Sequence, residues 1–175
     1  MTSNVLITKG SAKIWKSSGG NGVITFTSVA NAAGRQGDRV DLGDLLLADN
    51  AARASWFIWY VTCKMQTSGL TLGNTIDLYF GGWNDDSTPA QPDAGGFLGT
   101  TDAAFSTAAG LYNLKLAGSV IVDSTSGGTV LSKSGLVFLP YRYVAPVLWN
   151  GSGATASSTA TDTQIWLTPF NPQAQ

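Results

Sequence analysis

The residues of this chain that could do chemistry are few and belong to a narrow set of types. The sequence has no histidine, and all 11 acidic residues are aspartates. A serine or cysteine nucleophile usually needs a neighbouring base, most often histidine, to take its proton. The single cysteine, Cys63, lies in an apolar run, where a buried and inert thiol is expected. The composition therefore predicts a protein that is not an enzyme.

Three carboxylates are close enough in sequence to form a site. Asp85, Asp86 and Asp93 occupy one Gly- and Pro-rich stretch beside Trp83. Clustered carboxylates can bind Ca²⁺, and a pair of them can act as acid and base on a glycoside. Their spacing matches no known calcium loop. A solvated loop is therefore the first interpretation, and a metal site is the alternative.

A glycine-rich pattern follows the last long apolar run. Residues 151–156 match G-x-G-x-x-A, which in a dinucleotide site would open a helix and lead to a second parallel strand. The remaining sequence is polar and short, so the pattern predicts a turn and no cofactor. The sequon at Asn150 matters only in a secretory pathway, and Met1 to Lys16 shows no signal peptide.

The charge content limits the classes of partner. Charged residues make up 12% of the chain, about half the usual share of roughly 25%. Without a basic patch, neither nucleic acid nor an anionic membrane surface is an expected partner. No apolar run approaches the roughly 20 residues that span a bilayer. A surface built of Gly, Ser, Thr and Ala favours packing against other protein.

The elements that position these residues are mostly strands. Short apolar runs are separated by turn signals, and β-branched residues outnumber strong helix formers. The pattern predicts an all-β protein, an antiparallel β-sandwich or jelly roll of about eight strands with at most one short helix, over 101–109. We expect two parts, an N-terminal arm or first strands in 1–38 and the sandwich domain in 39–175.

The longest predicted strand, 54–65, is apolar on both faces. We expect Trp56, Ile58 and Tyr60 in the buried core, together with Ile165 and Leu167 of the last strand. Trp59 belongs to the other face, which would be covered within the chain or by another subunit.

The stretch 134–170 is expected to close the sandwich. The run 143–149 is also apolar on both faces, and Pro146 lacks the N–H of a ladder, so an edge or bulged strand is predicted. With the strand 163–168 it would form a β-hairpin with a long tip.

Aromatic residues at strand positions are more often core or subunit interface than ligand platforms. The candidates for an interface with another subunit or another protein are Trp59, Trp83, Trp149 and Asn150. The alternative is sugar stacking on Trp15, Trp83, Trp149 or Trp166, although a small-molecule ligand is not favoured.

Three segments carry a resemblance to a known family. They are RVDLG at 39–43, GGFLGTTDAAF at 95–105, and LPYRYVAPVLWNGSG at 139–153, the last followed by DTQIWLTPF. In this pattern of strands and turns, the chain from Arg39 onward resembles the jelly-roll capsid cement (decoration) proteins of tailed bacteriophages.

The resemblance implies a virion structural protein without a cofactor. Such a protein is made in the bacterial host cytoplasm and sits on the capsid surface. It binds the major capsid protein, commonly as a homotrimer, and stabilises the head shell. The alternatives are another virion component, such as a tail or fibre-base protein, and a jelly-roll carbohydrate-binding module.

Overall fold

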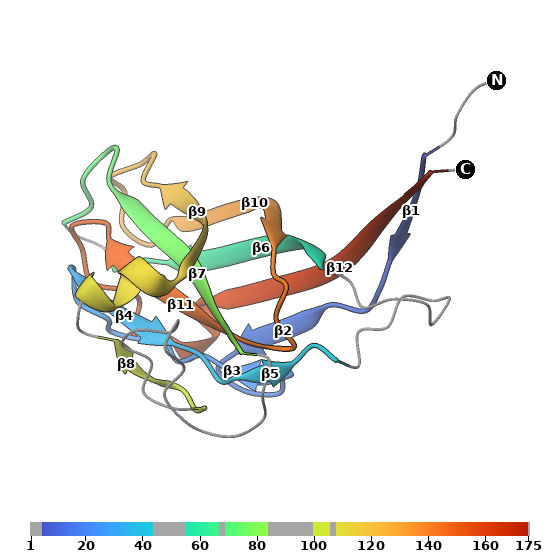
Figure 1. Cartoon of the computed structure of the whole chain (residues 1–175). Coiled ribbons are helices and arrows are strands. Elements are labelled where there is room, and N and C mark those ends of the chain that lie inside the picture. The colour runs from blue at the N-terminus through green and yellow to red at the C-terminus, as the bar shows by residue number, and fades with distance from the viewer. Residues whose placement is uncertain (1–4, 44–54, 67–68, 84–99, 106–107, 175) are drawn as a thin grey trace.

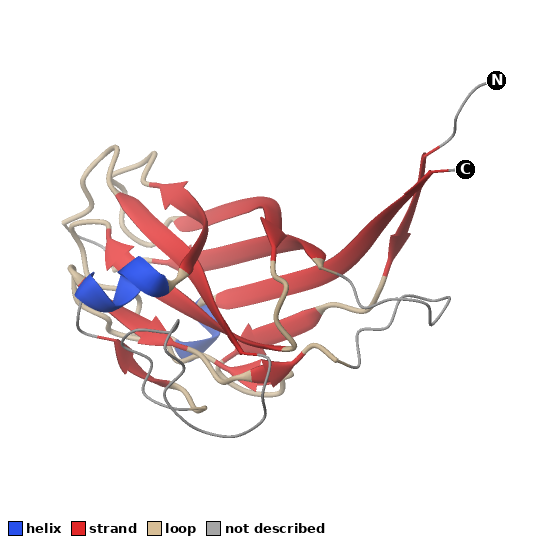
Figure 2. Ribbon diagram, viewed as in Figure 1, coloured by secondary structure: helices blue, strands red, loops and turns tan. Residues whose placement is uncertain are grey.

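The computed structural model describes residues 5–43, 55–66, 69–83, 100–105 and 108–174 (Figure 1). Strands dominate this part of the chain, and its only helices are two short 3-10 helices (Figure 2). The elements are β1 (Val5–Lys9), β2 (Lys13–Lys16), β3 (Gly22–Val23), β4 (Ala33–Gln36), β5 (Val40–Asp41), β6 (Trp56–Lys64), β7 (Thr75–Trp83), β8 (Ala103–Phe105), η1 (Ala108–Asn113), β9 (Lys115–Ile121), β10 (Val130–Phe138), β11 (Tyr143–Gly151), η2 (Ala160–Asp162) and β12 (Gln164–Ala174).

The strands form two sheets in jelly-roll order. Sheet A runs β10-β6-β12-β2-β3, and sheet B runs β8-β4-β11-β7-β9. Eight of these strands alternate between the sheets along the chain, apart from the neighbours β7 and β9, as two Greek keys require. The predicted β-sandwich is confirmed. The other four strands, β1, β3, β5 and β8, are short additions, and only the pairing of β2 with β3 is parallel.

The predicted closing hairpin is wrong. β11 lies in sheet B between β4 and β7, whereas β12 lies in sheet A between β6 and β2. The segment between them therefore crosses from one sheet to the other and does not form a hairpin tip. Two adjacent strands joined by a long polar loop fit either arrangement, so the sequence pattern could not distinguish them.

Pro146 is in a central strand, contrary to the expected edge. Its carbonyl accepts a hydrogen bond from the Gly37 N–H at 2.8 Å, so the missing N–H faces the same side. On that side β11 pairs with β4 through residues 147–150 and with β5 through 143–144. The proline thus occupies the gap between two partner strands, where no ladder bond is lost.

The core lies between the two sheets. The face of β6 that it contains is opposite to the face predicted from the sequence. Phe57, Trp59, Val61 and Cys63 are buried against sheet B. Trp56, Ile58 and Tyr60 point outward, so their assignment to the core was wrong. When a strand is apolar on both faces, the alternation of its residues does not show which face is buried. The register in which β6 pairs with β12 and β10 determines which of its side chains point into the core. Ile165 and Leu167 are buried, as predicted.

A second apolar layer covers part of the outer face of sheet B. Leu111 of η1 and Leu114 pack with Phe105 and Val147. The helix predicted over 101–109 is replaced by β8, which pairs with β4, and by η1. The Asp102 carboxylate binds Arg35 of β4 and Thr25 in the segment after β3.

The N-terminal region is not a separate arm as a whole. β2 and β4 are integral to sheets A and B, so 13–36 correspond to first strands. β1 pairs with β12 from Val5–Ala174 to Lys9–Phe170, and this two-stranded ribbon extends beyond the sandwich (Figure 1). Within the described residues, no helix has the length and apolarity to cross a membrane.

Candidate functional site

The predicted carboxylate site cannot be placed. Asp85, Asp86 and Asp93 lie outside the described residues. In the part of the chain that the structure describes, no three potential metal ligands gather at one point.

Three of the four predicted interface residues, Trp59, Asn150 and Trp83, are buried within the chain. Trp59 is 2% exposed and lies between the sheets. Asn150 is fully buried, and its amide nitrogen donates to the carbonyl oxygens of Val29 at 2.9 Å and Ala154 at 2.8 Å. Its amide oxygen accepts the Ser152 hydroxyl at 2.6 Å. Neither Trp59 nor Asn150 has side-chain surface left for another subunit, which corrects that prediction. In the folded chain the Asn150 amide of the sequon is buried, so there is no space beside it for an attached glycan.

Trp83 and Trp149 belong to the outer face of sheet B. Trp83 is buried with Tyr143 and Ala145. Trp149 is half-buried, and its ring meets Phe105 edge-on with centroids 6.4 Å apart. Both indoles thus have partners inside the chain.

Two of the four tryptophans proposed for sugar stacking, Trp15 and Trp83, are buried. Trp15 is completely buried and packs near Phe80. Trp166 lies on the outer face of sheet A, and its ring packs on that of Tyr60 with centroids 5.1 Å apart.

Exposed aromatic and aliphatic side chains lie side by side on the outer face of sheet A, which we call the aromatic face. Pairing of β6 with β10 puts Trp56 beside Phe138, with ring centroids 5.3 Å apart, and Ile58 beside Leu136. Pairing with β12 puts Tyr60 beside Trp166. The aromatic face is defined by Trp56, Ile58, Tyr60, Leu136, Phe138 and Trp166.

Adjacency separates this surface from single exposed apolar residues such as Leu116. Trp56 is 45% exposed, Tyr60 40% and Leu136 56%, although they are neighbours in one sheet. Contiguous apolar patches of this kind usually mark contact with another molecule. The sequence carried a signal for it, because β6 is apolar on both faces, but the two faces were assigned the wrong way round.

A charged corner joins the segments that carry the family resemblance. Arg142 pairs with Asp41 at 2.9 Å, and the guanidinium groups of Arg39 and Arg142 each lie 4.9 Å from the Tyr143 ring centre. Hydrogen bonding from Arg142 lowers the pKa of Asp41. The Arg39 N–H also donates to the Thr100 carbonyl at 2.9 Å. Residues from all three segments therefore meet at one corner of the sandwich.

Asp102 forms a second polar junction beside that corner. Its carboxylate accepts two bonds from Arg35, at 2.8 and 2.6 Å, and others from the backbone and hydroxyl of Thr25. Burial acts to raise the pKa of Asp102, but the bonds from Arg35 and Thr25 outweigh it and the pKa is lowered. Asp38 joins the network by accepting the Asp102 N–H at 2.7 Å. The junction ties β8 to β4 and to the segment after β3.

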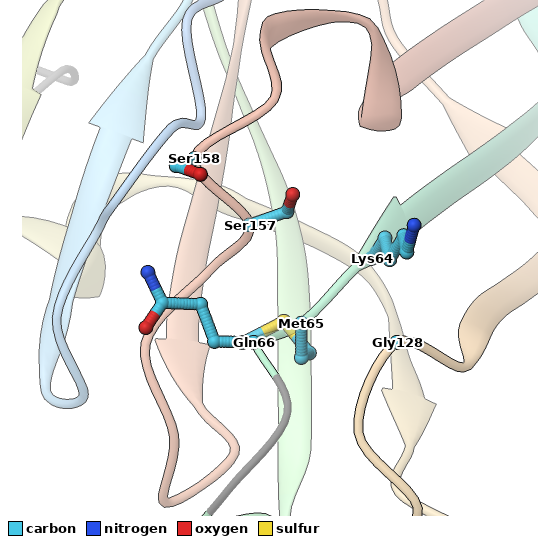
Figure 3. A pocket seen from close by; sticks show the side chains of 6 residues that line it. All are labelled: Lys64, Met65, Gln66, Gly128, Ser157 and Ser158. Carbon is cyan, nitrogen blue, oxygen red and sulfur yellow. The ribbon is translucent and has the colours of Figure 1, made fainter.

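A pocket of about 330 Å³ lies at the end of β6 (Figure 3). Its polar groups already bind one another. The Ser157 hydroxyl donates to Asp162 at 2.6 Å, and the Lys64 ammonium lies 3.8 Å from the same carboxylate. The Ser157 N–H bonds the Lys64 carbonyl at 2.9 Å. These contacts hold the segment that crosses from β11 to β12 against β6. The polar groups at the pocket therefore join two parts of the fold. It is lined by Lys64, Met65, Gln66, Gly128, Ser157 and Ser158.

No protein-family model matches this chain, and no curated protein shows significant similarity to it.

Proposed function

We propose that this protein is a structural component of a tailed-bacteriophage virion, a cement protein that binds the head shell and stabilises it. The observation that carries the proposal is the aromatic face. A freely diffusing monomer rarely keeps so many aromatic side chains exposed side by side on one sheet. A protein that functions within an assembly has a use for such a surface.

Two further observations support the same function. The jelly-roll order of the strands agrees with the fold that the family resemblance implies. The three segments that carry the resemblance are far apart in sequence, yet they converge at the Arg39–Arg142 corner. The partners in this proposal are other copies of the chain, as a homotrimer, and the major capsid protein.

Mixing the purified protein with undecorated shells tests the proposal. Cement proteins make modest contacts in many symmetric copies, so their combined effect on the shell is large. We expect bound protein at a fixed ratio to the shell protein, and a higher melting temperature of the shell.

The number of copies per virion separates the alternatives. Many copies in proportion to the shell protein support a cement role, whereas a handful would indicate a tail or fibre-base protein. A glycan array is the control for the carbohydrate-binding alternative. Glycan binding without any effect on shells would replace the proposal.

A further inference from the structure

The aromatic face has a chemical character that restricts what can cover it. No described side chain that points outward from the aromatic face is charged. This holds for residues 56–62 of β6, 132–138 of β10 and 164–168 of β12. Outward charges lie at the border of the face. Lys64, at the end of β6, faces Asp162. On β2, Lys16 shares the outer face of Ile14, which is paired with Trp166. A charged partner surface would lose hydration here without gaining an ion pair.

A second copy of the same chain fits these conditions. The same uncharged face on another copy brings no like charges together, and the formal net charge of −1 adds little repulsion between whole chains. Burial of the face would proceed through the hydrophobic effect alone.

The aromatic face is large enough for the centre of a subunit contact. Its uncharged part runs from Trp56 to Thr62 on β6 and from Ser132 to Phe138 on β10. Three strands about 4.8 Å apart with a rise of about 3.4 Å per residue give this part a flat area on the order of 350 Å². A standard interface buries about 800 Å² of accessible surface per partner. That figure includes the sides of protruding side chains and a polar rim, neither of which the flat area counts. The aromatic face can therefore supply the apolar centre of such an interface.

The ring geometry disfavours a sugar polymer as the occupant. A flat polysaccharide needs coplanar rings. The Trp56–Phe138 and Tyr60–Trp166 pairs are tilted by 60° and 50°. Tilted rings interlock with the side chains of another protein.

We infer that the aromatic face is the surface through which copies of this chain associate. This inference deepens the proposed function, on which it rests for its setting, because it identifies the contact between copies. It does not depend on which surface touches the shell. An isologous contact, face on face, would give a dimer, and contact with a different surface of the next copy would close a ring.

The test compares the same substitution on two surfaces. Leu136→Lys on β10 and Tyr60→Lys on β6 place an ammonium group in the aromatic face. Leu116→Lys and Ile121→Lys are the matched controls, because both residues are about half exposed on β9 of the other sheet. All four sites are exposed, so each variant should keep the thermal unfolding profile of the parent fold.

Sedimentation at micromolar concentration is the readout. We expect the parent chain and the β9 variants to sediment as one oligomer. We expect the two variants of the aromatic face to shift toward the monomer, with the dissociation constant between copies raised at least about tenfold, since an unpaired charge would be buried. A monomeric parent chain, or an equal effect of Leu136→Lys and Leu116→Lys, would overturn the inference.

Shell binding distinguishes this inference from the proposed function. If Leu136→Lys leaves the oligomer intact but abolishes shell binding, the face binds the shell, and only the inference fails. If the aromatic face holds copies together but no variant and no parent protein binds shells, the inference stands and the cement function fails.

Discussion

Trp59 extends from sheet A across glycines on two other strands. A Cβ atom added at Gly135, its cross-strand neighbour on β10, would lie 2.7 Å from the indole, and one added at Gly118 on β9 would lie 2.5 Å away. The indole therefore fills the space that two missing side chains leave. Its Nε1–H has no hydrogen-bond partner among the described residues, so packing alone holds it.

Trp59→Ala is expected to lower the free energy of unfolding by about 3–5 kcal/mol, because it leaves a large cavity between the sheets. Denaturant unfolding monitored by circular dichroism measures the change. Trp56→Ala in the aromatic face is the matched control and should cost much less in the monomer. Equal effects of the two variants would contradict the placement of Trp59 in the core.

Gly135→Ala should destabilise the fold by about 1–3 kcal/mol through overpacking against the indole. The neighbouring exposed Ser134 provides the control, and Ser134→Ala should change the stability by less than about 0.5 kcal/mol. In a Trp59→Ala background the cost of Gly135→Ala should fall, since the clash partner is gone. A cost independent of Trp59 would assign it to the backbone.

Cys63 is expected to be chemically silent in the folded protein. Burial raises the pKa of its thiol to about 12, and the side chain is fully buried. The thiolate, which is the reactive form, is therefore scarce and inaccessible near neutral pH. An aromatic disulfide reagent should label no thiol in the native chain and one in denaturant. Rapid native labelling would show that β6 opens.

At the scale of elements, the ion pair of Asp102 adds a second attachment to β8, which also pairs with β4. The Arg35–Asp102 pair is 2.6 Å long and largely shielded from water. Asp102→Asn removes the charge that Arg35 and Thr25 bind, and should cost about 2 kcal/mol at neutral pH. Asp41→Asn is the control, since the Arg142 side chain in that pair is half exposed and such pairs contribute little.

The effect of Asp102→Asn should depend on pH. The pKa of Asp102 is lower in the folded chain than in the unfolded one. Its contribution is therefore complete well above about pH 4, the ordinary range of an aspartate, and is lost as the pH falls through the lowered folded value. Urea unfolding at pH 7 and pH 3 should show a smaller difference between variant and parent at the lower pH. A difference that grows in acid would contradict the ion pair.

The elements predicted from the sequence differ in how well they match the structure, and the reasons are local. The strand at 56–64 was placed well because its apolar run is long, but its faces were exchanged because both are apolar. The sequence also predicts β11, but Pro146 indicates an edge strand. The proline is tolerated in the centre of the sheet because it lies between the residues that pair with β4 and those that pair with β5, and the sequence of β11 does not show where its partner strands end. The helix at 101–109 failed because pairing with β4 outweighed local propensity.

At the scale of the whole molecule, the sandwich was predictable and its connections were not. Turn signals and β-branched runs indicate strands wherever they occur in sequence. The chain crosses from sheet B to sheet A between β11 and β12 because β12 pairs with β6 and β2. Those two strands are far from β12 in the sequence, so the local pattern does not reveal the crossing. The aromatic face shares that difficulty, because an exposed apolar row and a buried one have the same alternation in sequence.

The position of β12 in sheet A determines when the fold can be completed. β12 is the last strand in the described part of the chain, and it lies between β6 and β2, with Ile165 opposite both Val61 and Trp15. While a ribosome is still making the chain, β2 and β6 have no ladder to join them and both keep an open edge. Such long-range closure makes β-rich chains slow to fold, on the order of milliseconds to seconds. Until Gln164 and the residues after it emerge, the growing chain presents two unpaired strand edges and a half-formed core, which is when it is most exposed to aggregation.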